Sequence, residues 1–131
     1  SRHDYEAIPS TIANQIFNNL SSMLPSLKDS RFAGNLVKQA DNFAYLDPVD
    51  NSISKNQGLR IILEDNSRVI LRLSGTGTKG STLRLYFEKF SSSQQNLVLN
   101  PQVALKDLIN DLDHLLSISK LTKMEKPTVI T

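Results

Sequence analysis

The chain has 131 residues, which suits a single domain, residues 1–131, with one hydrophobic core. Its 15 Lys and Arg against 13 Asp and Glu leave a formal net charge of only +2, and the basic residues are dispersed, so neither nucleic acid nor a membrane surface is indicated as a partner. The absence of cysteine excludes a disulfide framework and a thiolate zinc site, and no apolar run approaches the length of a membrane span.

The N-terminal residues, Ser1 to Glu6, contain neither the basic nor the apolar region of a secretory signal. Because the chain lacks an initiator methionine and opens in a charged stretch, we expect it to be processed or cut from something longer. A cysteine-free chain is compatible with the cytosol, and we expect a cytoplasmic location. His3 and His114 lie too far apart in the sequence, with too few partners, to indicate a metal site.

An amphipathic helix is predicted from residue 9 to about residue 24, opened by Pro9 and Ser10. Its apolar residues recur at helical spacing: Ile12, Ala13, Ile16, Phe17, Leu20, Met23 and Leu24. Pro25 is expected to end this helix. Residues 36–46 then predict a strand, and the turn-forming residues 47–52 predict a loop.

An antiparallel meander is predicted for the middle of the chain. Leu59, Ile61 and Leu63 alternate toward a core, and Asp65-Asn66 can take the positive φ of a tight hairpin turn. The alternating residues 68–73 and 83–88 predict two more half-buried strands. We therefore expect a sheet of about four strands.

A second helix is predicted after the polar loop of residues 91–95. Asn100-Pro101 supplies an N-cap and first helical position, and the apolar face would carry Val103, Leu105, Leu108, Ile109, Leu112, Leu115 and Leu116. Two helices on one face of an antiparallel sheet give an α+β domain. The opposite face of the sheet would be solvated or would meet another domain.

The most informative feature is the glycine-rich segment between the last two strands. If these strands pair with Leu73 opposite Leu83, Arg72 falls opposite Arg84 on the polar face. Like charges in direct opposition are unfavourable, and an anion between them would remove that cost. The register therefore predicts an anion site at the end of this hairpin.

The loop itself carries the groups that a phosphate oxygen needs. Ser74 and Thr76 supply hydroxyls, and Gly75 and Gly77 allow backbone N–H groups to converge without a Cβ in the way. Arginine adds bidentate, charge-assisted hydrogen bonds. The pattern alone leaves open a plain structural hairpin loop with two exposed arginines.

Three nucleotide-binding motifs fit less well. Gly75-x-Gly77-x-x-Gly80 satisfies the dinucleotide-binding pattern literally, but that pattern requires a following helix, and a strand is predicted here. In the P-loop pattern the lysine position holds Ser81, while Lys79 lies on the wrong side of the glycine. A protein kinase would need a downstream lysine strand, catalytic loop and metal-binding aspartate motif, which the sequence lacks.

The segment Arg-Leu-Ser-Gly-Thr-Gly followed by Thr-Leu-Arg-Leu-Tyr resembles the phosphate-binding loop in the C-terminal domain of the α-D-phosphoglucomutase family. The likeness extends nearly end to end, in the family's order, through residues 2–6, 40–43, 47–50, 56–60 and 127–131. The resemblance implies a fold like that of TATA-box-binding protein, as the fourth domain of a four-domain enzyme that interconverts glucose 1-phosphate and glucose 6-phosphate.

The resemblance also implies what this chain would not contain. In the family, a phosphoserine lies on the first domain, Mg²⁺ on the second and the sugar-reading loop on the third, and glucose 1,6-bisphosphate is the intermediate. The three corresponding motifs are absent from this sequence. We therefore expect no catalytic residue and no metal ligand here, no activity of this chain alone, and the other three domains and a hexose phosphate as partners.

Carried over residue by residue, the resemblance implies a grip on the non-reacting phosphate and a part in closing the cleft. Arg84 would bind the phosphate bidentately, and Arg72 would orient the loop and add positive charge. The loop hydroxyls and glycine amides already named, Ser74, Gly75, Thr76 and Gly77, would complete the grip. Arg2 is a weaker candidate for closing the cleft, and Lys79 is interpreted as a solvated loop charge.

Two alternatives remain at this point. The first is a non-enzymatic, parafusin-like relative that acts in exocytosis or protein interaction; such a protein would be free to lose the loop and its arginines, which are intact here. The second is a mutase for another hexose phosphate, since the sugar would be read by a domain outside this chain.

Overall fold

The computed structural model describes residues 1–46, 53–74, 80–89 and 105–131. The expected loops at 47–52 and 91–95, the glycine-rich segment 75–79 and the helix start at Asn100-Pro101 lie outside the described residues. Within them the elements are β1 (Arg2–Ile8), α1 (Ser10–Leu27), β2 (Arg31–Phe32), β3 (Asn35–Leu46), β4 (Ile53–Leu63), β5 (Arg68–Ser74), β6 (Ser81–Glu88), α4 (Lys106–Leu116), α5 (Ile118–Thr122) and β7 (Val129–Ile130).

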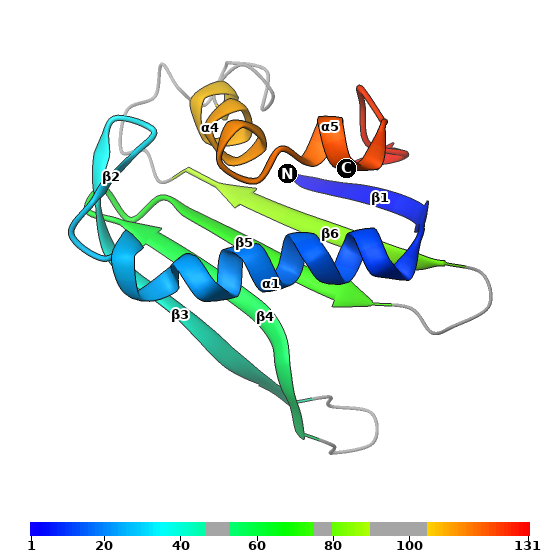
Figure 1. Ribbon diagram of the computed structural model, residues 1–131. Helices are drawn as coiled ribbons and strands as arrows, with labels where there is room; N and C mark the ends of the chain where they lie inside the picture. The colour runs from blue at the N-terminus through cyan, green and yellow to red at the C-terminus, as the bar shows by residue number, and fades with distance from the viewer. Residues whose placement is uncertain (47–52, 75–79, 90–104) are drawn as a thin grey trace.

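The strands form one antiparallel sheet in the order β2-β3-β4-β5-β6-β1-β7 (Figure 1). The α+β class and the predicted meander, here β3 to β6, are confirmed. The expected count of about four strands is wrong, because the described residues form seven. Three strands were not predicted. Two of them, β2 and β7, are short strands at the edges of the sheet, and the third, β1, is the N-terminal strand, which pairs with β6.

The predicted hairpin turn between β4 and β5 is confirmed. Asn66 takes a φ of 68°, and the carboxylate of Asp65 accepts a hydrogen bond of 2.9 Å from the backbone N–H of Ser67. Asn and Asp favour such turns because their short polar side chains bond the nearby backbone and tolerate positive φ. This turn sets the register in which Leu59 lies opposite Leu71.

Helix α1 is longer than predicted, because Pro25 lies inside it instead of ending it. Proline fixes φ near the helical value and removes one donor, while the buried side chains of Leu24 and Leu27 hold the last turn against the core. Four further buried side chains lie on the same face of the helix: Ala13, Ile16, Phe17 and Leu20.

The C-terminal helical region contains two helices where one was predicted, so three helices cover the sheet in the described residues instead of two. Ser117 takes a left-handed conformation, with φ 54°, and separates α4 from α5. The side chain of Asp113 stabilises this break, because it accepts hydrogen bonds from the backbone N–H and the hydroxyl of Ser119 at 2.7 and 3.0 Å.

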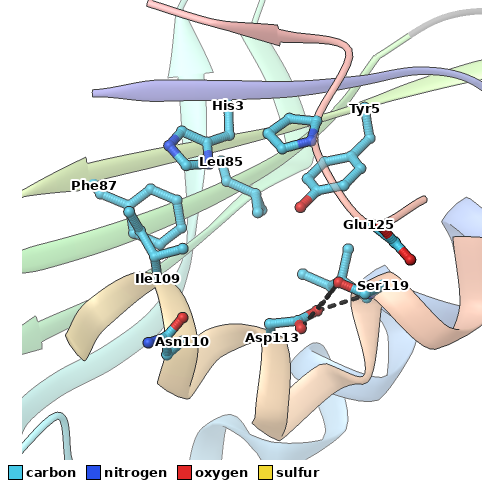
Figure 2. Close-up of a pocket in the computed structure, with 11 residues that line it drawn as sticks. His3, Tyr5, Leu85, Phe87, Ile109, Asn110, Asp113, Ser119 and Glu125 are labelled. Carbon is cyan, nitrogen blue, oxygen red and sulfur yellow. Dashed lines mark hydrogen bonds between the residues drawn. The ribbon is translucent and has the colours of Figure 1, made fainter. Parts of the chain in front are cut away.

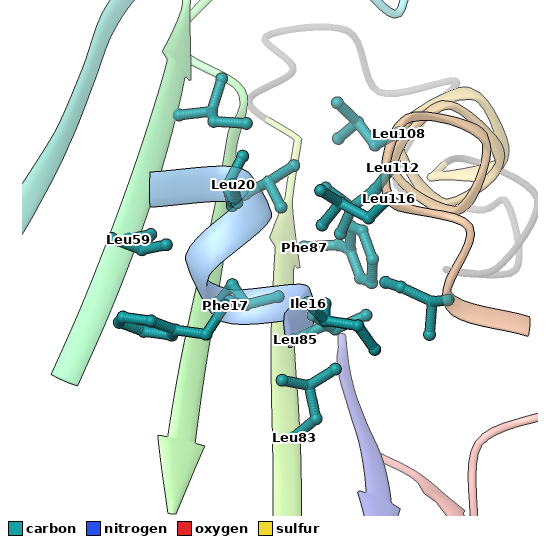
Figure 3. Packing of buried hydrophobic residues seen from close by; sticks show 14 of the residues in the cluster. Ile16, Phe17, Leu20, Leu59, Leu83, Leu85, Phe87, Leu108, Leu112 and Leu116 are labelled. Carbon is teal, nitrogen blue, oxygen red and sulfur yellow. The ribbon is translucent and has the colours of Figure 1, made fainter. Parts of the chain in front are cut away.

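The hydrophobic core lies between one face of the sheet and the helices (Figure 3). Helix α1 packs on this face and contacts α4 and α5 at its side. From the sheet come Leu59, Ile61, Leu63, Val69, Leu71, Leu83, Leu85 and Phe87, none more than 2% exposed. Each fully buried side chain of this size contributes about 1.5–3 kcal/mol to stability. The alternate residues of the same strands point to the other, open face.

Candidate anion-binding site

Arg72 and Arg84 lie directly opposite each other on β5 and β6, and Leu73 lies opposite Leu83. The predicted register is therefore confirmed. Leu83 is fully buried in the core, so Arg84, the next residue on β6, and Arg72, its partner on β5, face the open side of the sheet. The Arg84 side chain is 39% exposed. Two guanidiniums are thus brought to the same place on a surface that solvent can reach.

A buried carboxylate extends this row onto β1. Asp4 lies opposite Arg84, and its side chain is only 3% exposed. Its Oδ2 atom is 3.2 Å from Nη2 of Arg2, and its Oδ1 atom is 3.7 Å from Nε of Arg84. We call Arg72, Arg84, Asp4 and Arg2 the arginine row; it places Arg2, the weaker sequence candidate, beside the two main ones.

Sequence reasoning missed Asp4. Aspartate is seldom buried, so the sequence gives no direct indication that Asp4 lies beside the arginines. The available signal was the alternation of Arg2 and Asp4 with His3 and Tyr5, which places the two charges on one face of a strand.

The arginine row carries three guanidiniums and one carboxylate, which leaves two net positive charges. A phosphate monoester carries about −1.5 to −2 charge at neutral pH. Arginine matches phosphate oxygens bidentately, through parallel N–H donors. The charge and the donor chemistry of the row therefore suit one phosphate group.

The strand ends that flank the glycine-rich segment in the sequence contact β1 and α1. Ser74 pairs with Thr82 at the end of the β5-β6 ladder. Gly80 has a φ of +83°, and a Cβ on it would lie 2.9 Å from the carbonyl oxygen of Ile8. The hydroxyl of Ser81 lies 3.1 Å from that of Ser10, at the start of α1. Glycine is required at position 80 because the backbone approaches β1 closely there.

Most of the loop residues predicted to bind phosphate belong to the glycine-rich segment. Gly75, Thr76 and Gly77 lie outside the described residues, and Ser74 is placed by its backbone pairing alone. Their roles stay predictions.

Two further ion pairs lie on the open face beyond the arginine row. Arg60 donates two hydrogen bonds to Asp41, at 2.9 and 2.7 Å. These bonds hold the pKa of Asp41 below its ordinary value. Arg68 pairs with Glu88 across β5 and β6. Each of these two arginines therefore has a carboxylate partner on a neighbouring strand.

The helix side of β1 holds a different feature, a cavity of about 130 Å³ between β1, α4 and α5 (Figure 2). His3 and Tyr5 point into it, and the ring of His3 packs edge-on against Phe87 at 5.0 Å. Burial and the negative charge of Asp113 raise the pKa of Tyr5. Because His3 and Tyr5 alternate with Arg2 and Asp4, this cavity and the arginine row lie on opposite faces of β1.

Among the described residues, no group of three or more His, Cys, Asp or Glu side chains is arranged to hold a metal ion. Within the same ranges, none of the helices combines the length and apolar character needed to cross a membrane.

Comparison with known proteins assigns the family. Residues 1–128 match the family model described as the C-terminal domain of phosphoglucomutase-1. The chain belongs to this phosphoglucomutase C-terminal domain family. The phosphoglucomutase resemblance recognised in the sequence is thereby confirmed.

Individual relatives agree over the whole chain. It is 47% identical to the phosphoglucomutase of Rhizobium radiobacter over 131 residues, and 40% identical to phosphoglucomutase-1 of Homo sapiens over 137 residues, in each case matching 100% of this chain. The crystal structure of the exocytosis-sensitive phosphoprotein pp63/parafusin (phosphoglucomutase) from Paramecium, in its open form, matches 99% of the chain with a TM-score of 0.79 and 40% identity. The chain spans only 24% of each of the two sequence relatives and 22% of the parafusin chain.

Proposed function

We propose that this chain is the C-terminal domain of a phosphoglucomutase, where it binds the non-reacting phosphate of the substrate and helps to close the active-site cleft. The full-length protein would interconvert glucose 1-phosphate and glucose 6-phosphate. The observation that carries the proposal is the arginine row: Arg72 and Arg84 lie opposite each other on the open face, on the two strands that flank the glycine-rich segment in the sequence, with a net charge matched to one phosphate.

Each residue of the site has a distinct role in this proposal. Arg84 donates two hydrogen bonds to phosphate oxygens, and Arg72 adds charge from the opposite strand. The Ser74 and Thr76 hydroxyls donate further bonds, and the Gly75 and Gly77 backbone amides line the remaining side of the anion. Arg2 completes the positive surface at the β1 edge.

The grip contributes to catalysis without touching the reacting atoms. Binding energy from a remote phosphate fixes the sugar at the reacting centre, and closing the cleft excludes water that would hydrolyse a phosphoenzyme. Donors that recognise phosphate and not sugar suit a substrate that presents its 1-phosphate in one half-reaction and its 6-phosphate in the other. Such a site would bind both isomers through the same atoms.

The remaining parts of the proposal concern the full-length protein. Mg²⁺ and glucose 1,6-bisphosphate would be its cofactors, with the metal on another domain, and this chain would hold only the remote phosphate of the bisphosphate. The partners of this chain would be the other three domains and a hexose phosphate. The full-length protein would lie in the cytoplasm, and the 131 residues of this chain would form one of its domains. The TATA-box-binding-protein-like fold likewise remains a proposal. Relatives named phosphoglucomutase in bacteria and mammals favour the enzyme over a non-enzymatic role.

The test is a coupled assay of the full-length protein that contains this segment, with glucose 1-phosphate as substrate. We expect turnover in the wild type and a loss of about 2–4 kcal/mol in kcat/KM for Arg84→Ala, within the range for removing one member of a desolvated charge pair. The matched control is Arg68→Ala, which removes an arginine from the same face outside the row and should leave kcat/KM within about twofold of wild type. Wild-type kcat/KM in Arg84→Ala would overturn the proposed grip.

A further inference from the structure

Asp4 is an unusual residue for the open face of a sheet. The side chains of Arg2 and Arg84, its two partners, are 38% and 39% exposed, yet the Asp4 side chain is only 3% exposed. Burying a carboxylate is costly unless charged partners and hydrogen bonds compensate. A carboxylate also reduces the attraction of the surface for phosphate. Both costs call for a specific role.

The contacts of Asp4 divide between two arginines. Its Oδ2 atom lies 3.2 Å from Nη2 of Arg2. Its Oδ1 atom lies 3.7 Å from Nε of Arg84, and both of these atoms are buried without a hydrogen-bond partner in the described part of the chain. An N–H to O hydrogen bond has a length of about 2.7–3.2 Å. A shift of well under 1 Å would therefore satisfy both atoms at once.

A bond from Nε has a consequence for the rest of the guanidinium. The group is planar, with one donor on Nε and four on the two terminal nitrogens. When Nε faces a buried carboxylate, the plane is fixed and the terminal nitrogens stay available for a ligand. Hydrogen bonds around active sites are often long without ligand and tighten in the complex.

We propose that Asp4 is a positioning residue for phosphate binding. Its carboxylate accepts a hydrogen bond from Nε of Arg84, so that both terminal nitrogens of Arg84 face the phosphate. This inference rests on the proposed function and adds to it the residue that orients the main anion ligand. Asp4 itself does not touch the substrate.

This role and plain electrostatics predict opposite signs. If Asp4 acted only as a negative charge near the site, Asp4→Asn would tighten phosphate binding. If it positions Arg84, Asp4→Asn weakens binding despite the added positive charge, because a misplaced ligand group costs up to about 100-fold. The variant therefore separates the two readings by the direction of the change.

The experiment measures glucose 1-phosphate binding to the full-length protein by calorimetry, with KM and the melting temperature for each variant. We expect Kd to rise about 10- to 100-fold in Asp4→Asn. The matched control is Asp41→Asn, which removes another arginine-paired carboxylate from the same face and should leave Kd unchanged. In an Arg84→Ala background, Asp4→Asn should weaken binding no further, because its effect passes through Arg84.

The outcomes are distinguishable. An unchanged or lower Kd in Asp4→Asn, with Arg84→Ala still impaired, overturns the positioning role and leaves the proposed function standing. Unimpaired binding and turnover in Arg84→Ala overturns the proposed function itself.

If Asp4→Asn does not fold, an NMR measurement on the wild-type protein tests the positioning role of Asp4. With ¹⁵N-labelled arginine, the Nε–H resonance of Arg84, assigned by its loss in Arg84→Lys, should exchange slowly with water when glucose 1-phosphate is bound. Exchange as fast as that of the exposed Arg31 would overturn the inference.

Discussion

The two faces of the sheet differ in what they contribute. The helix-covered face carries Leu59, Leu71, Leu83 and their neighbours, which are at most 2% exposed. The open face carries five arginines, Arg2, Arg60, Arg68, Arg72 and Arg84, and a buried acid, Asp4, that lies between Arg2 and Arg84. Successive side chains along the same strands point to opposite faces of the sheet. The residues that stabilise the fold and the residues proposed to bind the ligand therefore alternate in the sequence.

The largest effect is expected from a truncation on the covered face. Phe87 on β6 is 1% exposed. Phe87→Ala should lower the unfolding free energy by about 3–5 kcal/mol, because it leaves a cavity in the core. Denaturant unfolding measures this loss. Leu36→Ala is the control, since Leu36 is apolar but 42% exposed, and should cost less than about 1 kcal/mol. Equal losses in the two variants would contradict the assignment of stability to the covered face.

A truncation in the arginine row should give the opposite pattern. Arg72→Ala removes a charge that faces Arg84, so the unfolding free energy should change by less than about 1 kcal/mol. Phosphate affinity should fall by about 1.5–3 kcal/mol, the value of a hydrogen bond to a charged group. Parallel unfolding and calorimetric binding measurements on the full-length protein test the split. A loss confined to stability would show that Arg72 serves the fold and not the ligand.

The chain just before β6, at Gly80, should be sensitive to a single methyl group. Gly80→Ala introduces a Cβ at 2.9 Å from the Ile8 carbonyl oxygen in a residue with φ +83°, and about 1–3 kcal/mol of stability should be lost. Gly34→Ala is the matched control, because Gly34 has a similar φ of +81° but nothing within 4 Å of a new Cβ. The melting temperature of Gly34→Ala measures the effect of backbone strain alone, and that of Gly80→Ala measures backbone strain together with the steric clash against Ile8. If Gly34→Ala loses as much as Gly80→Ala, the close approach to β1 has no energetic weight.

The smallest effect concerns the Asp41–Arg60 pair. The arginine lowers the pKa of Asp41 from its ordinary 3.8, so the pair stabilises the fold above that pH, and the stabilisation is lost as pH falls through the lowered pKa. Because the pair is about a third exposed, we expect less than about 1 kcal/mol. Unfolding from pH 6 to pH 2 should show the gap between wild type and Asp41→Asn closing below about pH 4. A gap that widens toward acid would contradict the sign.

The sequence predicted those parts of the fold in which alternation and turn chemistry agree. Leu59, Ile61 and Leu63 point to the core, and the Asp65-Asn66 turn joins β4 to β5. Pairing Leu73 with Leu83 in the next hairpin placed Arg72 opposite Arg84, as the structure confirms. Local patterns decide such features because both partners lie close together along the chain.

Features set by long-range contacts were missed. Strand β1 carries polar residues that are buried on both faces, His3 and Asp4, so its hydropathy does not predict a strand. Its partner β6 lies far along the chain, and only their pairing brings Asp4 to Arg84. Similarly, Pro25 is tolerated because of packing around it, which no local signal encodes.

The central claim is that the open face binds phosphate without reading the sugar. The most direct measurement is an NMR titration of this 131-residue chain with glucose 1-phosphate, glucose 6-phosphate, inorganic phosphate and, as a control, glucose. We predict that the three phosphates shift the same amides, those of residues 72–84 and Asp4, and that glucose shifts none. Shifts caused equally by glucose, or no shifts in these amides at millimolar phosphate, would contradict the claim.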